Sequence, residues 1–134
     1  MCSILLVEDN NIFRRSLKEM LTMHFPAMGI HEASNADEAL DLIDAQDPDL
    51  IFMDIKLPGK NGLELTRAIK RAKSDIHVII FTSYDLPEYR DAAFRCGASH
   101  FFTKGEVKSE ELAAAVSSAL ERKCEICPGN NGPH

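Results

Sequence analysis

The chain has 134 residues, the length of one ordinary domain, and 45% of them are apolar, which suits a packed core and not a disordered chain. Its net charge is −6, from 21 acidic and 15 basic residues, so we do not expect direct nucleic-acid binding through phosphates. No apolar run approaches the roughly 18 residues of a membrane span, and the apolar part of the N-terminal MCSILLVEDNN is too short for a secretory signal. These features predict a cytoplasmic protein without a membrane partner.

Short apolar runs alternate along the chain with segments of helical periodicity. The expected strands are SILLV (3–7), MGIHEAS (28–34), LIFM (50–53), HVIIF (77–81) and SHFF (99–102). Apolar residues repeating every three or four positions predict helices through Phe13–His24, Ala36–Ile43, Leu65–Ala72, Tyr89–Cys96 and Leu112–Leu120. The capping-box pattern marks two helix starts, at Asn35-x-x-Glu38 and Asp85-x-x-Glu88.

This alternation predicts an α/β fold with a doubly wound, five-stranded parallel sheet and helices on both faces. The strands at 4–7, 50–53 and 78–81 are apolar without alternation, so they should be central and buried on both sides. The more polar segments at 28–34 and 99–102 should form the edges. A strand order of 2-1-3-4-5, as in flavodoxin-like folds, fits this division, and it places the ends of the first and third strands together at the topological switch point.

The C-terminal end of the chain differs from the rest. Residues 1–122 are expected to form the domain, whereas residues 123–134, KCEICPGNNGPH, lose all periodicity and are predicted to be a tail or the stub of a linker. Cys124 and Cys127 form a single CxxC pair, which cannot complete a tetrahedral zinc site. Cys2 and Cys96 lie in apolar stretches and are expected to be reduced core thiols.

Three carboxylates should meet at the switch point. Glu8 and Asp9 follow the first strand, and Asp54 follows the third. Carboxylates that close repel one another, and a hard divalent cation relieves the repulsion; Mg²⁺ suits such a site because it accepts a few carboxylates and keeps waters for a phosphate to displace. The alternative, that Glu8 and Asp9 merely cap the first helix, leaves Asp54 unexplained.

Two further strand ends reach the same edge of the sheet. The fourth strand finishes with Thr82 and Ser83, and the fifth is followed by Lys104. Hydroxyls and an ammonium beside carboxylates and a metal make a phosphate-binding set. The combination is hard to assign to packing, although each residue alone is a weak signal.

The motifs ILLVEDN, DLIFMDIKLPGKNG, VIIFTS and GASHFFTKG occur in order between residue 3 and about residue 122. In this set and spacing the chain resembles the receiver domain of two-component response regulators, which has the CheY-like (βα)5 fold. The resemblance implies a phosphoacceptor, Asp54, that takes a phosphoryl group from the phosphohistidine of a sensor histidine kinase or a histidine phosphotransfer protein. Such a domain is no enzyme in the ordinary sense, although it assists its own phosphorylation and dephosphorylation.

The resemblance also implies roles for the neighbouring residues. Glu8, Asp9 and Asp54 would hold Mg²⁺ together with the backbone carbonyl of Lys56. Thr82, Ser83 and Lys104 would bind the phosphoryl group, and Phe101 stands at the aromatic switch position. The fourth helix, fifth strand and fifth helix would form the output surface toward a downstream protein or domain, and a homodimer is possible.

Several positions depart from the family's pattern. Glu8 replaces the commoner Asp, which keeps the charge with one more methylene. Gly105 stands after Lys104 where the family usually has a proline in a cis bond; a non-proline cis bond costs about 2.5–4 kcal/mol, so this bond is either trans or strained. Phe101 lacks a tyrosine hydroxyl, so a switch there must depend on packing alone.

The residues argue against several other functions. A Mg²⁺-dependent phosphohydrolase with an aspartyl nucleophile would need a second acid, and Ile-Lys-Leu after Asp54 lacks the usual DxD arrangement. The glycine pattern around Gly59-Lys60 is no P-loop, and no flavin phosphate loop follows the first strand. Two alternatives stay open: a receiver-like interaction module that works without phosphate, and a receiver fragment of a DNA-binding transcription factor.

Overall fold

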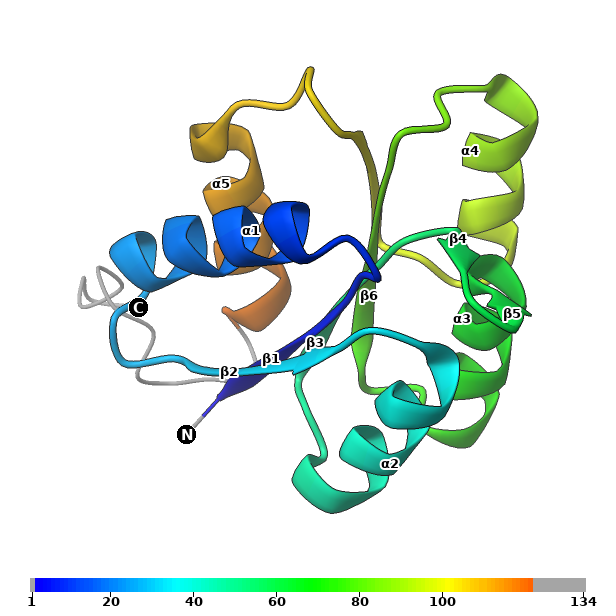
Figure 1. The fold of residues 1–134 in the computed structure, drawn as a ribbon, viewed down its shortest axis with the longest axis horizontal. Coiled ribbons are helices and arrows are strands. Elements are labelled where there is room, and N and C mark those ends of the chain that lie inside the picture. The colour runs from blue at the N-terminus through cyan, green and yellow to red at the C-terminus, as the bar shows by residue number, and fades with distance from the viewer. Residues whose placement is uncertain (1, 122–134) are drawn as a thin grey trace.

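The computed structural model describes residues 2–121, and a parallel sheet forms the centre of that part (Figure 1). Its strands are β1 (Ser3–Val7), β2 (Gly29–Ala33), β3 (Leu50–Met53), β6 (His77–Thr82) and β7 (His100–Thr103). They pair in parallel in the order β2-β1-β3-β6-β7. Numbered among themselves these are strands 2-1-3-4-5, so the predicted fold class and strand order are confirmed.

Five helices cover the two faces of the sheet. They are α1 (Asn11–His24), α2 (Ala36–Gln46), α3 (Gly62–Ala72), α4 (Pro87–Arg95) and α5 (Ser109–Leu120). In Figure 1, α1 and α5 lie on one side of the sheet and α2, α3 and α4 on the other. The molecule therefore has three layers, with a separate apolar cluster on each face of the sheet.

The central strands contribute side chains to both apolar clusters, because successive side chains of a strand point to opposite faces of the sheet. In β1, Leu5 packs among residues of α2 and α3, while Ile4 and Leu6 pack among residues of α1 and α5. All four residues of β3 are buried, whereas β2 and β7 are partly exposed, as predicted for edge strands. Burying each such Leu or Ile contributes about 1.5–3 kcal/mol, and this fixes the register of the strands.

Asparagines begin the helices nearest the carboxyl edge of the sheet. The side chain of Asn10 accepts hydrogen bonds from the amides of Ile12 and Phe13 at the start of α1. Asn35 caps α2 by accepting from the amide of Glu38, as predicted. These caps satisfy amides that have no partner within the helix, and they fix where each helix leaves its strand.

The predicted cap of α4 is wrong. The N-cap residue is Leu86, without a side-chain hydrogen bond, and Asp85 lies before it with its carboxylate 4.0 Å from Arg90. Pro87 opens the helix instead, because its fixed φ suits the first helical position and it has no amide hydrogen that needs a partner. A proline two residues after Asp85 therefore outweighs the capping-box pattern.

A short antiparallel hairpin was not predicted. Strands β4 (Lys56–Leu57) and β5 (Lys60–Asn61) pair around Pro58 and Gly59, between β3 and α3. Pro followed by Gly is a turn signal, and two-residue strands are too short to leave an alternating pattern in the sequence. The hairpin connects the residue after β3 to the start of α3.

The cysteine predictions have mixed outcomes. Cys96 is a free, buried thiol, as predicted. Cys2 is disulfide-bonded, so the prediction of a reduced thiol is wrong there. An apolar, buried setting suits a disulfide as well as a thiol. Cys124, Cys127 and the rest of the predicted tail lie outside the described residues.

None of the helices within residues 2–121 has the length and apolar character needed to cross a membrane.

Candidate functional site

Glu8, Asp9 and Asp54 meet at the carboxyl edge of the sheet. The backbone holds them there: the amide of Asp54 donates to the carbonyl of Val7 at 3.1 Å, and the amide of Glu8 donates to that of Ala33 at 3.0 Å. One carboxylate oxygen from each of the three acids lies within 4.8 Å of the others. Glu8 and Asp54 are buried and Asp9 is exposed, so the cluster opens to solvent on one side. The predicted convergence of these acids is confirmed.

Lys104 reaches this cluster from the loop after β7. Its Nζ donates hydrogen bonds to Oε1 of Glu8 and, at 3.1 Å, to Oδ2 of Asp54. Its own amide donates to the carbonyl of Thr82 at 2.7 Å, which places the loop beside the end of β6. Only 5% of the Lys104 side chain is exposed. A buried ammonium shared by two buried carboxylates is tolerated because each charge has a partner.

The remaining carboxylate oxygens also have partners. Oδ1 of Asp54 accepts from the amide of Ile55 at 2.7 Å, and Oε2 of Glu8 accepts from the amide of Asn10 at 2.9 Å. Arg14 donates to the backbone carbonyl of Glu8 at 2.7 Å and so supports the same loop from α1. Both acids are thereby held in fixed orientations toward one point.

The environment of Glu8 favours a bound positive charge. Burial raises the pKa of the Glu8 carboxyl above its usual value, and the negative charge of Asp54 acts in the same direction. The hydrogen bonds from Lys104 and from the amide of Asn10 lower it, but they do not cancel the effect of burial. Three carboxylates share the single ammonium of Lys104 at this edge, and an all-oxygen donor set of this kind suits a divalent cation.

Gly62 allows α3 to begin directly against the residue that carries the site. A Cβ at this position would lie 1.9 Å from the carbonyl oxygen of Asp54, and the Gly62 amide donates to Ile55 at 2.7 Å. Asn61 caps the same helix by accepting from the amide of Leu63. Only glycine permits this approach, so the turn after Asp54 depends on Gly62. This contact joins two segments of the chain through the fold and leaves no local pattern in the sequence.

The other predicted residues fall around the acidic cluster. Thr82 is fully buried at the end of β6, where its hydroxyl oxygen accepts from the amide of Tyr84 at 3.3 Å, while Ser83 is exposed. Phe101 is buried in β7, and the Arg90 guanidinium lies 4.8 Å from the centre of its ring. Lys56 is exposed in β4, two residues past Asp54.

The Lys104–Gly105 bond is trans, since residues 2–121 contain no cis peptide bond. The strained alternative does not occur. Gly105 has a φ of +89°, a conformation that glycine adopts without steric cost. The loop thus turns at a glycine, and Lys104 still reaches the acids.

Comparisons with known proteins agree with this geometry. Residues 4–117 match the family described as the response regulator receiver domain. The chain belongs to this family. The chemotaxis protein CheY of Halobacterium salinarum is 37% identical over 117 residues, which cover 87% of this chain and 95% of that protein. A crystal structure of the receiver domain of a DNA-binding response regulator from Colwellia psychrerythraea is 28% identical, with a TM-score of 0.85, and the match covers 90% of this chain and 99% of that one.

Other relatives of this receiver domain are longer. The transcriptional regulatory protein DegU of Brevibacillus brevis is 28% identical over 125 residues, which cover 93% of this chain and 52% of that protein. The chain thus spans about half the length of several curated relatives.

Aromatic rings near the site were missed by the sequence analysis. The Nζ of Lys104 lies 4.5 Å from the ring centre of Phe13, and the Nζ of Lys56 lies 5.1 Å from that of Tyr84. Phe13 was assigned only to the apolar stripe of α1, although its place in the first turn after the acidic pair could have pointed to the site.

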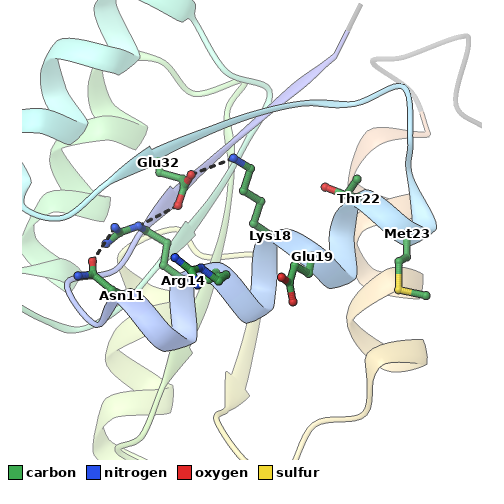
Figure 2. A pocket seen from close by; sticks show the side chains of 8 residues that line it. Asn11, Arg14, Lys18, Glu19, Thr22, Met23 and Glu32 are labelled. Carbon is green, nitrogen blue, oxygen red and sulfur yellow. Dashed lines mark hydrogen bonds and ion pairs between the residues drawn. The ribbon is translucent and has the colours of Figure 1, made fainter.

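A separate hollow lies along α1 and the edge strand β2. It has a volume of about 1050 Å³, and its lining includes Arg14, Lys18 and Glu32. Figure 2 shows Glu32 between Arg14 and Lys18. The nitrogen–oxygen distance is 3.0 Å in each of the two ion pairs. Arg14 also donates a hydrogen bond to the backbone carbonyl of Glu8, so it connects the ion pairs between α1 and Glu32 to the acidic cluster.

Proposed function

We propose that this receiver domain accepts a phosphoryl group on Asp54 from the phosphohistidine of a sensor histidine kinase or a histidine phosphotransfer protein. The observation that supports this most is that Asp54, Glu8 and Lys104 follow three different strands and meet at one point. There the Lys104 ammonium contacts both the Glu8 and the Asp54 carboxylate. An Asp54 oxygen attacks phosphorus, an O–P bond forms, and the P–N bond to the imidazole breaks.

Glu8, Asp9 and Asp54 would hold Mg²⁺, with the backbone carbonyl of Lys56 as a further ligand. The donor set fits, since it is all oxygen and brings three carboxylates together. Bound Mg²⁺ would neutralise charge that develops on the transferred phosphoryl oxygens. Lys104 would also neutralise this charge, because its ammonium is a point charge already in contact with Asp54.

Thr82 and Phe101 would convert phosphorylation into a change of surface. The Thr82 hydroxyl donates to a phosphoryl oxygen once one is present, and Ser83 lies beside it. The space that Thr82 vacates lets the buried Phe101 ring repack, which changes the face formed by α4, β7 and α5. Because Phe101 has no hydroxyl, this change depends on packing, and Arg90 on α4 lies over the ring and would move with it.

The output partner is either a separate protein or a domain joined to the receiver, and the pairing of two receivers is a further possibility. The chain spans about half the length of relatives such as the transcriptional regulatory protein DegU, and this supports a receiver of a transcriptional regulator. CheY, with 95% of its length covered, supports a receiver that acts without an attached domain.

The proposal is tested with beryllium fluoride, which occupies phosphoryl sites on carboxylates. Adding it with Mg²⁺ to the ¹⁵N-labelled protein should shift amide resonances at Asp54, Thr82 and Lys104, and along α4, β7 and α5. The Asp54→Asn variant should show no such change. If the wild-type spectrum does not change with Mg²⁺ and beryllium fluoride, the receiver chemistry is wrong and an interaction module independent of phosphate is favoured.

A further inference from the structure

The Lys104 side chain is held in the site although no other segment of the described structure packs against the Cβ position of the next residue, Gly105. The peptide bond to Gly105 is trans, Gly105 has a φ of +89°, and nothing lies within 4 Å of where its Cβ would be. The lysine stem itself has several rotatable bonds and favours solvent for its charged end. Yet only 5% of the Lys104 side chain is exposed. Contacts other than the loop must therefore keep its ammonium in the site.

Aromatic faces supply such contacts. The Lys104 Nζ lies 4.5 Å from the ring centre of Phe13 and 6.0 Å from that of Phe81, both within the range of a cation–π interaction. Phe81 belongs to the buried strand β6, whereas Phe13 is 38% exposed and borders the ammonium at the molecular surface.

The position of the Phe13 ring is fixed by the start of α1. Its amide donates to the Asn10 side chain at 3.1 Å, and the Asn10 amide donates in turn to Glu8 at 2.9 Å. The ring therefore belongs to the same capped turn as the acidic cluster. The backbone that carries the ring is thus anchored beside Glu8, on a segment separate from the Gly105 loop.

We propose that Phe13 is a positioning residue for Lys104: its ring face holds the ammonium against Glu8 and Asp54, a task that the loop at Gly105 leaves undone. The inference rests on the proposed function, in which Lys104 stabilises charge on the transferred phosphoryl group. The negative face of the ring attracts the ammonium. It does not compete with the carboxylates for the hydrogen bonds that the ammonium donates, because the ring has no oxygen to accept them. Without the ring, the ammonium would spend part of its time in solvent.

The test compares Phe13→Leu with Phe13→Tyr. Leucine keeps an apolar side chain but has no ring face, whereas tyrosine keeps the face. Phe94→Leu is the matched control, because Phe94 is similarly exposed, at 46%, but lies on α4. The rate of phosphorylation by acetyl phosphate is measured at saturating Mg²⁺, together with the ¹H shifts of the Lys104 ε-methylene protons, which a nearby ring moves upfield.

We expect Phe13→Leu to lower the maximal rate by about two- to thirtyfold, the factor that corresponds to a cation–π interaction, and to move the Lys104 ε-protons downfield. In Phe13→Tyr and in Phe94→Leu, the maximal rate and the ε-proton shifts should both stay close to those of the wild type. Equal rates for the Leu and Tyr variants, or ε-proton shifts that do not respond to Phe13→Leu, would overturn the positioning role. If the wild type took up no phosphate, the proposed function would fail, and the ε-proton shifts would still decide whether the ring holds the ammonium.

Discussion

At the scale of single residues, Lys104 has two opposed effects on the site. Its ammonium contacts Glu8 and Asp54, and it would stabilise the oxygens of a phosphoryl group on Asp54. A cation that contacts a metal's carboxylate ligands competes with that metal. The same side chain should therefore weaken metal binding and favour phosphoryl transfer.

Replacing Lys104 should separate these effects. In Lys104→Met, we expect Mg²⁺ to bind roughly ten- to a hundredfold more tightly, since a hydrogen bond to a charged group contributes about 1.5–3 kcal/mol. Phosphorylation by acetyl phosphate should become slower. Calorimetric titration with Mg²⁺ measures the first and intact mass over time the second. Lys73→Met, which removes a lysine paired with Asp47 on another part of the surface, is the control. Weaker Mg²⁺ binding in Lys104→Met would contradict the competition.

At the scale of elements, the turn from β3 into α3 depends on one glycine. In Gly62→Ala the new Cβ would meet the backbone carbonyl of Asp54, which cannot rotate away as a side chain would. We expect a loss of about 1–3 kcal/mol or more in the free energy of unfolding, measured with urea. Gly29→Ala is the matched control, because its Cβ would lie 3.6 Å from the Ser3 Cβ, an ordinary van der Waals contact. This substitution should be neutral or should stabilise the fold by about 0.5–1 kcal/mol. Similar losses in both variants would refute the close-approach argument.

The ion pairs between α1 and β2 should make stability depend on pH. Partial burial acts to raise the pKa of Glu32, but the hydrogen bonds and charges of Lys18 and Arg14 outweigh it, so the pKa lies below its usual value of 4.5. The folded state thus favours the carboxylate, and the resulting stabilisation is present above pH 4.5 and is lost as the pH falls through the lowered pKa.

Glu32→Gln should consequently be less stable than the wild type near neutral pH, by no more than about 1 kcal/mol because the pairs are partly exposed. The difference should shrink below about pH 4. Urea unfolding across a pH series measures it, with Glu19→Gln on α1 as the control. A difference that stays constant down to pH 3 would show that Glu32 does not act through its charge.

At the scale of the whole molecule, the sheet could be predicted because its strands have unambiguous patterns. Apolar runs such as 50–53 must be buried on both faces, and this places them in the centre and brings Glu8, Asp9 and Asp54 together. What the sequence did not reveal depends on contacts between distant segments. The approach of Gly62 to the Asp54 carbonyl and the Phe13 ring beside Lys104 leave no periodic signal, and Pro87 overrode a local capping pattern.

The central claim is that Asp54 takes up a phosphoryl group with the help of a divalent cation. Intact mass after incubation with Mg²⁺ and acetyl phosphate tests it most directly, with Asp54→Asn and an EDTA-treated sample beside the wild type. We predict an increment of one phosphoryl group in the wild type that is absent from both controls. An unmodified wild type, or equal modification of Asp54→Asn, would contradict the claim.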